Sequence, residues 1–263
     1  MAERLEKLRG WFDNYVAGFY GDDEFINANI KLKEEHSRRT CSEMLYLAEQ
    51  LGLDAKEKQM AEAAALLHDI GRFEQFAKYR TYNDTRSVNH CLLGVDVLTR
   101  TGVLDDFDRQ TKQIIEKAIE YHGAKELPRN LDGRCLLLSQ MLRDADKLDI
   151  FRIVVQEYAR YRANPDEFEL EVEFPDRNEY CAEIVQDILK GQRIDYGRLR
   201  TLNDMKLLQV GWVYDVNFVP TLERIKERKF LESLVGFLPE TADVRQVRDK
   251  IFEYVDSRIQ QGR

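Results

Sequence analysis

The chain of 263 residues is long enough to bury a substantial core, and its hydrophobic content of 43% is ordinary for a water-soluble protein. Its 48 acidic residues outnumber the 40 basic ones, which gives a formal net charge of −8 without any dense basic run. This balance disfavours a nucleic-acid polymer as a partner, because such polymers are held by clustered Lys and Arg. No segment approaches the roughly 18 apolar residues of a membrane span, so no membrane partner is expected.

The N-terminal segment, residues 1–20, mixes charged and aromatic residues at helical spacing and lacks the apolar core and cleavage site of a signal peptide. We therefore expect a cytoplasmic protein. The four cysteines lie 40 or more residues apart, without the short spacing of zinc knuckles or redox motifs, and are expected to be reduced. Only Cys91, which follows His90, is a candidate for redox effects.

Apolar residues recur at helical spacing almost throughout, so the sequence predicts an all-α fold. The first core-facing helix is predicted over residues 32–51, with His36 near its start and Gly52 as its C-terminal stop. A second helix is predicted over residues 55–69, ended by Gly71. Both predicted helices carry a histidine on or next to an apolar face.

Three further helices follow in the same half of the chain. One begins near Ser87, a plausible N-cap, and carries His90 on its inner side. The next covers residues 107–122 and ends on a histidine. The last covers residues 134–151 and places Asp146 beside its apolar stripe.

From residue 151 onward the chain is again predicted to be helical, except where Glu alternates with apolar residues as in a strand, at residues 167–174. That segment fits a flap, a short hairpin, an edge at an oligomer contact, or a connector with one packed side. A boundary near residue 160 divides a domain of residues 1–160 from a helical appendage of residues 161–263 that is expected to pack on it.

All the histidines of the sequence lie on or at the ends of apolar helix faces: His36, His68, His90 and His122. One such histidine is more often a core residue than a ligand. Four of them, together with Asp69 and Asp146, favour a metal site. Imidazoles and carboxylates coordinate divalent iron, manganese, zinc or nickel, and facing helices bring such ligands together across a bundle core.

The ordered set resembles the HD-domain superfamily of metal-dependent phosphohydrolases, whose ligands follow the order His, His-Asp, Asp. The matching segments are "EEHSRRT", "LLHDIGR" and "LRDADKLD", and they cover roughly residues 30–152. In that pattern the last ligand is the Asp of an Ala-Asp-Lys triplet, which selects Asp146 over Asp144 and Asp149. The resemblance implies a helical metal-binding catalytic domain within residues 1–160.

His90 and His122 extend the resemblance to the branch with six ligands and two metals, which includes cyclic-dinucleotide phosphodiesterases and di-iron oxygenases. The resemblance implies one ion on His36, His68 and Asp146, a second on His90 and His122, and Asp69 as the bridging, catalytic carboxylate. The implied cofactors are divalent metal ions, two in this case, drawn from Fe, Mn, Co, Ni and Zn. The alternative is a mononuclear site with His90 and His122 in supporting or core positions.

Several basic residues are candidates for binding a phosphate. Arg72 occupies the place of the basic residue that follows His-Asp-x-Gly in related phosphodiesterases, and Lys147 resembles the basic residue that often follows the last ligand. Arg80 belongs to residues 72–87, a segment with a local charge of +2 that suits a phosphate-binding lid or an ordinary solvated loop. Arg39 lies one turn after His36.

The leading hypothesis is hydrolysis of a phosphate ester, of a nucleotide or another small phosphorylated metabolite, by a metal-bound hydroxide. The segment after His122 lacks the Gly-Tyr-Pro signature of cyclic-di-GMP phosphodiesterases, which disfavours that substrate. Two alternatives are a di-iron oxygenase of the HD-domain type and a catalytically silent metabolite-sensing module. Assembly into a homo-oligomer stays open.

Overall fold

The computed structural model describes residues 2–165 and 174–262 and confirms the all-α prediction, since every regular element within these ranges is a helix. The chain forms two compact units, Met1–Asp149 and Ile150–Arg263. The predicted strand-like segment at 167–174 lies outside the described residues except for Phe174. Among the described helices, none combines the length and the apolar character needed to cross a bilayer.

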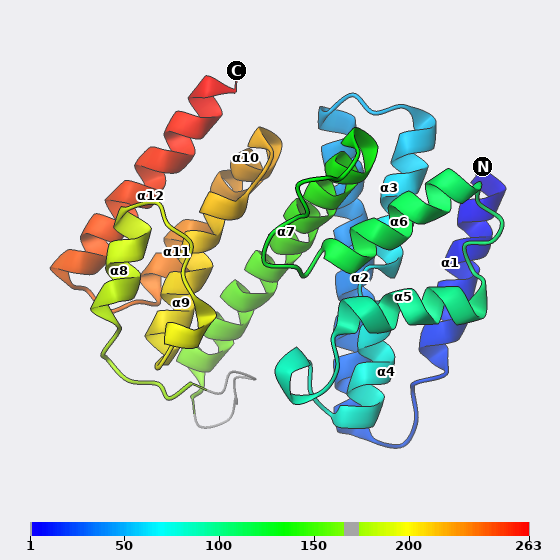
Figure 1. Cartoon of the computed structure of the whole chain (residues 1–263). Helices are drawn as coiled ribbons and strands as arrows, with labels where there is room; N and C mark the ends of the chain where they lie inside the picture. Colours follow the sequence, from blue (N-terminus) through cyan, green and yellow to red (C-terminus); the bar gives the residue numbers. More distant parts are fainter. Residues whose placement is uncertain (1, 166–173, 263) are drawn as a thin grey trace. The chain divides into compact units, whose positions relative to one another are not determined.

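The first unit contains six helices and the start of a seventh: α1 (Ala2–Ala17), α2 (Glu24–Gln50), α3 (Ala55–Leu67), α4 (Ile70–Tyr79), α5 (His90–Thr101), α6 (Arg109–Tyr121) and α7 (Gly133–Ala163). A single 3₁₀ turn, η1 (Asp84–Arg86), precedes α5. Helices α2 and α3 pack along each other, α6 packs on α3, and α4 packs on both α2 and α5 (Figure 1).

Side-chain caps fix the starts of several of these helices. The Asp23 carboxylate accepts the backbone N–H of Ile26 at the start of α2, and Asp108 accepts that of Thr111 at the start of α6. Such caps satisfy amides that have no partner inside the helix. The predicted stop after α2 is confirmed, because Gly52 follows with φ +68°, a conformation that glycine adopts without steric cost.

The structure corrects the prediction for residues 55–87. Helix α3 ends at Leu67, and the chain turns at His68 and Asp69 before continuing as α4, which sequence analysis had assigned to a loop. Phe73 and Phe76 lie on one face of α4 and are buried, which explains why the segment is helical despite its many charges. Gly71 therefore lies inside the first turn of a helix.

The start of the following helix also differs from its prediction. Asn89, whose side chain accepts the backbone N–H of Leu92, caps α5, whereas Ser87 ends the preceding 3₁₀ turn. His90 is consequently the first residue of α5. Its position at a helix start, instead of one turn inside, fixes the direction from which its side chain enters the core.

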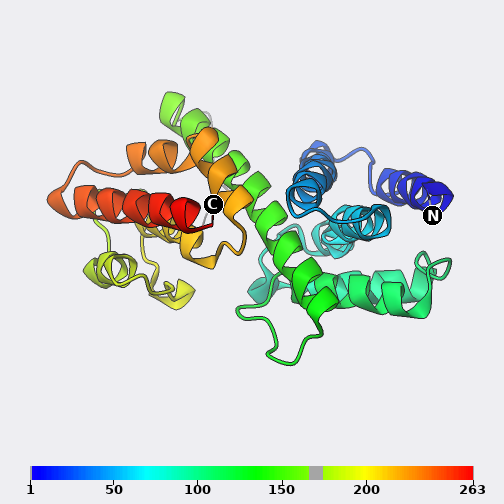
Figure 2. The ribbon, with the colours of Figure 1, turned by 90° about the horizontal axis from the view of Figure 1, so that it is seen from above.

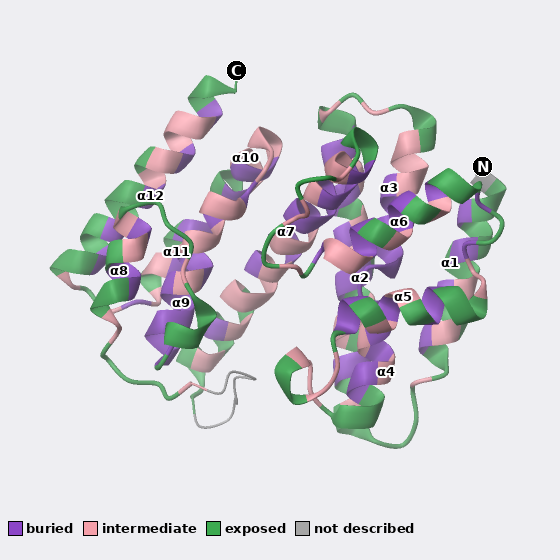
Figure 3. Ribbon diagram, in the orientation of Figure 1, coloured by how far each residue is buried: buried purple, intermediate pink, exposed green. Residues whose placement is uncertain are grey.

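The second unit holds the end of α7 and α8 (Ala182–Leu189), α9 (Leu202–Gly211), α10 (Val219–Glu227), α11 (Phe230–Gly236) and α12 (Ala242–Gln261), with short 3₁₀ turns η2 (Tyr196–Arg198) and η3 (Trp212–Asp215). Helix α12 packs on α8 and α10 (Figure 2). Helix α9 is almost wholly buried, as its purple colour in Figure 3 shows. Phe151 packs its ring against Trp212 and Phe230 within this unit.

Candidate metal centre

All six predicted ligands lie in the first unit, and the fold brings them together. They come from five places: α2 (His36), the junction of α3 and α4 (His68 and Asp69), the start of α5 (His90), the end of α6 (His122) and the middle of α7 (Asp146). Four of the six lie at helix ends, where the backbone changes direction. Short side chains from several elements can therefore converge on one point.

The first cluster joins His36, His68 and Asp146. The Nε2 atoms of the two histidines are 3.2 Å apart, and Oδ1 of Asp146 lies 3.1 Å from the first and 3.6 Å from the second. Oδ2 of Asp69 completes the cluster at 3.5 and 3.6 Å from the same two nitrogens. Two nitrogen and two oxygen donors thus surround one point.

The second cluster joins His90 and His122, whose Nε2 atoms are 3.2 Å apart. Oδ1 of Asp69 lies 3.7 Å from each of them. Each oxygen of the Asp69 carboxylate therefore faces a different pair of histidines. This is the arrangement expected of a carboxylate that bridges two cations.

The remaining ring nitrogen of each histidine is held by an acceptor outside the cluster. The Nδ1–H groups of His68 and His122 donate to the carbonyl oxygens of Ala65 and Ile119, at 2.8 and 2.7 Å. A carbonyl oxygen only accepts, so Nδ1 carries a proton and Nε2 is the nitrogen left to bind a cation in the centre.

Carboxylates hold the other two histidines in the same way. His36 Nδ1 is 2.8 Å from Oδ2 of Asp149, and His90 Nδ1 is 2.7 Å from Oδ2 of Asp84. An outer acceptor of this kind fixes the tautomer and ring orientation of a metal-binding histidine and raises its basicity. All four imidazoles are thus oriented with Nε2 inward.

Buried charges at the centre point to a bound cation. Burial opposes ionisation of Asp69, but the positive charges of Lys33 and Arg72 outweigh it and hold the pKa of that carboxyl well below its usual range. Burial likewise opposes ionisation of Asp146, and a hydrogen bond from His36, whose own pKa is raised, lowers the pKa of that carboxyl well below the usual value. Two ionised carboxylates and the inward-facing Nε2 atoms, which lose any proton they carry when a cation binds, form a donor set that a divalent cation satisfies.

Lys33 and Arg72 lie beside the carboxylate of Asp69. Lys33 Nζ is 2.8 Å from Oδ2 of Asp69, and Arg72 Nε is 3.5 Å from its Oδ1. Arg72 also donates from Nη1 to Oδ1 of Asp84, at 2.9 Å. Arg72 is one of the basic residues predicted from the sequence, whereas Lys33 is not among them. The signal was present, because Lys33 lies one helical turn before His36 and so shares its face of α2.

The other basic candidates occupy different settings. Arg39 makes a bidentate ion pair with Asp149, with Nε 2.6 Å from Oδ1 and Nη2 3.1 Å from Oδ2. It therefore supports the carboxylate that orients His36. Arg80 ends α4 and forms an ion pair with Asp23 at the surface, 2.6 Å from Nη1 to Oδ2. Lys147 is half-buried next to Asp146 in α7. Arg72 thus contacts a residue of the centre directly, and Arg39 reaches His36 through Asp149.

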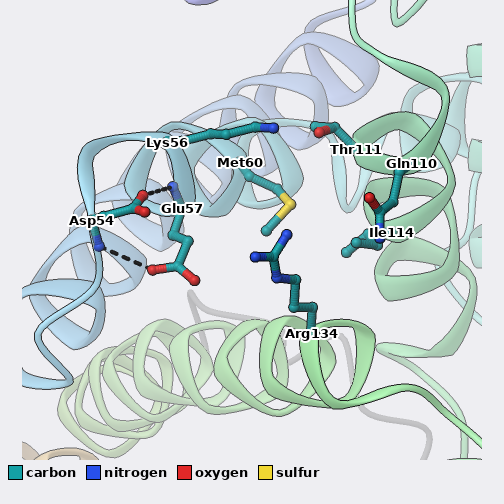
Figure 4. Close-up of a pocket in the computed structure, with 8 residues that line it drawn as sticks. All are labelled: Asp54, Lys56, Glu57, Met60, Gln110, Thr111, Ile114 and Arg134. Carbon is teal, nitrogen blue, oxygen red and sulfur yellow. Dashed lines mark hydrogen bonds between the residues drawn. The ribbon is translucent and has the colours of Figure 1, made fainter.

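Figure 4 shows a separate pocket of the first unit, lined by the starts of α3 and α6 and by Arg134 of α7. The capping box of Asp54 and Glu57 forms one edge of the pocket, and the side chain of Met60 also lines it. Its volume of about 40 Å³ holds no more than a few water molecules. It contains none of the predicted site residues and is too small for a metabolite.

Residues 34–150 match the model of the HD domain. This part of the chain is similar to the HD domain. The matched range begins two residues before His36 and ends just after Asp149, so it encloses all six residues of the centre. No curated protein and no solved structure gave a significant match.

The HD domain belongs to a class of metal-dependent hydrolases that bind divalent cations, and the clusters of this chain have the chemistry to do so. Within the described residues, three groups of donors are close enough for one ion: His36–His68–Asp146, His68–Asp69–His122 and His90–Cys91–His122. The third group includes a cysteine that sequence analysis did not count among the ligands.

Proposed function

We propose that this HD domain holds two divalent cations and hydrolyses a phosphate ester of a nucleotide or another small phosphorylated metabolite. The observation that carries the proposal is the placement of the two Asp69 oxygens. One oxygen faces the nitrogens of His36 and His68 and the other those of His90 and His122. A mononuclear site would need only one of these faces.

Two bound cations would lower the pKa of a shared water toward neutrality and hold the phosphoryl oxygens of the substrate. The residues of the chain then have separable tasks. The four histidines and Asp146 hold the ions, and Asp69 keeps them close together. Lys33 and Arg72 bring positive charge to the side of Asp69, where negative charge of a phosphoryl group would gather.

The other basic residues are proposed to act on the centre through a neighbour or to contact the substrate. Arg39 acts through Asp149 on His36, which makes it a positioning residue. Lys147, next to Asp146, is proposed to steady a phosphate or leaving oxygen. Arg80 is proposed to meet the substrate only if its surface ion pair with Asp23 opens.

The test is to count the ions per chain by elemental analysis of protein purified without chelator and without oxygen, and to assay a panel of phosphate esters. We expect close to two ions per chain and turnover of at least one ester. Asp69→Asn should remove at least one ion and lower turnover by a factor of 100 or more, on the order of 3 kcal/mol of transition-state stabilisation. The matched control is Asp106→Asn, which changes an exposed carboxylate before α6. It should change neither the number of bound ions nor turnover.

Three outcomes would contradict the proposal. Full turnover in Asp69→Asn would exclude a metal-bridging role for that carboxylate. Turnover that requires iron and consumes oxygen would identify an oxygenase. Tight binding of one phosphorylated metabolite without turnover of any ester would identify a sensing module.

A further inference from the structure

Cys91 lies at the second cluster in a position that the HD-domain match does not explain. It is the second residue of α5, directly after His90, and only 2% of its surface is exposed. Its Sγ atom lies 3.4 Å from Nε2 of His90 and 4.0 Å from Nε2 of His122, with Nδ1 of the latter at 3.6 Å. A thiol sulfur thus lies beside both imidazoles of the second cluster, closer to Nε2 of His90 than to Nε2 of His122.

The spacing of these atoms resembles that of a tetrahedral site. With metal–nitrogen bonds of about 2.0–2.1 Å and metal–sulfur bonds of about 2.3 Å, a tetrahedron separates two nitrogens by about 3.3 Å and nitrogen from sulfur by about 3.6 Å. The corresponding distances here are 3.2 Å between His90 and His122, and 3.4 and 4.0 Å to the sulfur of Cys91. Oδ1 of Asp69, at 3.7 Å from both nitrogens, supplies a fourth donor.

Gly123 leaves the room that this arrangement needs. A Cβ atom at that position would lie 2.9 Å from Sγ of Cys91 and 3.2 Å from Cε1 of His90. Real Cβ atoms essentially never show a contact as short as the one to the sulfur, so a side chain at Gly123 would push the sulfur away. The turn after α6 thus places a histidine in the centre and, one residue later, makes space for the thiol.

The two metal positions consequently differ in their donors. The first offers only nitrogen and oxygen, from His36, His68, Asp146 and Asp69. The second adds a sulfur atom. Thiolate ligands select zinc, iron and cobalt over manganese and magnesium, whose preferred donors are oxygens.

We propose that Cys91 is a ligand of the second metal position, which with His90, His122 and Oδ1 of Asp69 forms a mixed nitrogen, sulfur and oxygen site for a thiophilic cation such as zinc. Coordination releases the thiol proton to solvent. The inference rests on the two-metal centre proposed above and adds that its halves have different metal preferences. The first position accepts harder cations such as manganese.

The experiment is titration of metal-free, full-length protein with Co²⁺ under exclusion of oxygen, followed by absorption spectroscopy. A thiolate bound to cobalt gives a charge-transfer band in the near ultraviolet, which nitrogen and oxygen ligands do not give. We expect this band to grow with one of two bound equivalents. Cys91→Ser should abolish it, and Cys135→Ser, which changes another buried cysteine, should leave it intact.

Metal selectivity gives a second readout that does not depend on activity. Cys91→Ser should weaken zinc binding at the second position by at least about tenfold and leave manganese binding at the first unchanged. Gly123→Ala should act in the same direction, because it displaces the sulfur.

The outcomes separate this inference from the proposed function. Two bound cobalt ions without a charge-transfer band in the wild-type protein would overturn the role of Cys91 and leave the two-metal centre standing. One bound ion without the band would overturn both. One bound ion with the band would support the thiolate site and overturn the two-metal centre. These readings use the wild-type spectrum, so they hold even if a variant fails to fold.

Discussion

At the scale of single residues, each cluster has one histidine whose ring is oriented by a carboxylate outside the cluster. Asp84 holds Nδ1 of His90, and Asp149 holds Nδ1 of His36. Because each acts on one metal position, Asp84→Ala should weaken the second ion about 10- to 100-fold and leave the first, and Asp149→Ala should do the reverse. Titration of each variant against a competing chelator measures both affinities. Equal weakening of both ions in both variants would contradict this division.

Lys33 is the residue that most directly compensates the buried charge of Asp69 when no cation is present. Its ammonium contacts Oδ2, the oxygen that faces His36 and His68. Lys33→Met should therefore lower the free energy of unfolding of the metal-free protein by about 2 kcal/mol, since a buried carboxylate loses a partner. The same change should tighten metal binding, because a positive charge is removed from the site.

Urea unfolding with and without Mn²⁺ measures both effects of Lys33→Met. The matched control is Lys31→Met on the same helix, whose side chain is 69% exposed and pairs only loosely with Glu35, 4.0 Å away. That control should leave both quantities within about 0.5 kcal/mol of wild type. Weaker metal binding in Lys33→Met would show that the ammonium supports the loaded centre instead of competing with the cation.

At the scale of elements, the close approach of α4 and α5 sets the distance between Asp69 and His90. A Cβ atom at Gly71 would lie 2.4 Å from the carbonyl oxygen of His90 and 2.6 Å from the backbone nitrogen of Gly94. Both contacts are with backbone, which cannot turn aside as a side chain can. The glycine of the His-Asp-x-Gly motif is thus required by helix packing.

Gly71→Ala should therefore push α4 and α5 apart. We expect a loss of about 1–3 kcal/mol in the free energy of unfolding and weaker binding of the second ion, because the overpacked contact lies at His90. Gly10→Ala in α1, where an added Cβ meets nothing within 4 Å, should instead gain up to about 1 kcal/mol from helix propensity. Denaturant unfolding measures the free energy of unfolding of both variants, and metal titration measures their affinity for the second ion. Unchanged metal affinity in Gly71→Ala would exclude this packing role.

At the scale of the whole molecule, metal binding should couple to the stability of the first unit. The six predicted ligands come from five segments between residues 36 and 146, which the unfolded chain does not hold together. A cation at 100 times its dissociation constant should add about 2.7 kcal/mol to the free energy of unfolding. Removing it with a chelator should reverse the gain.

Hydrogen exchange of the full chain locates this effect. We expect added metal to slow amide exchange mainly within α2 to α6 and the first half of α7, because all the ligands lie there. The second unit, residues 150–263, contributes none of the six. Protection confined to α8 to α12 would be incompatible with the centre described here.

Much of the molecule follows from local pattern. Helical periodicity gives the all-α class, Gly52 gives the end of α2, and the order of His36, the His68–Asp69 pair and Asp146 gives the family resemblance that the HD-domain match supports. These features depend on residues close in sequence or on a linear motif, so a sequence alone carries them. The pattern failed at α4, where charged residues masked a buried face that only the packing of Phe73 and Phe76 makes evident.

The tertiary structure alone decided how the centre is built. Three features of the centre join distant parts of the chain. They are the orientation of the Asp69 oxygens toward the histidines, the contact of Lys33 with that carboxylate, and the support of His36 by Asp149, which is 113 residues away. Periodicity tells which face of a helix is buried but not what lies opposite that face. The role of a polar side chain in a core is set by its partner, and the partner is chosen only when the helices pack.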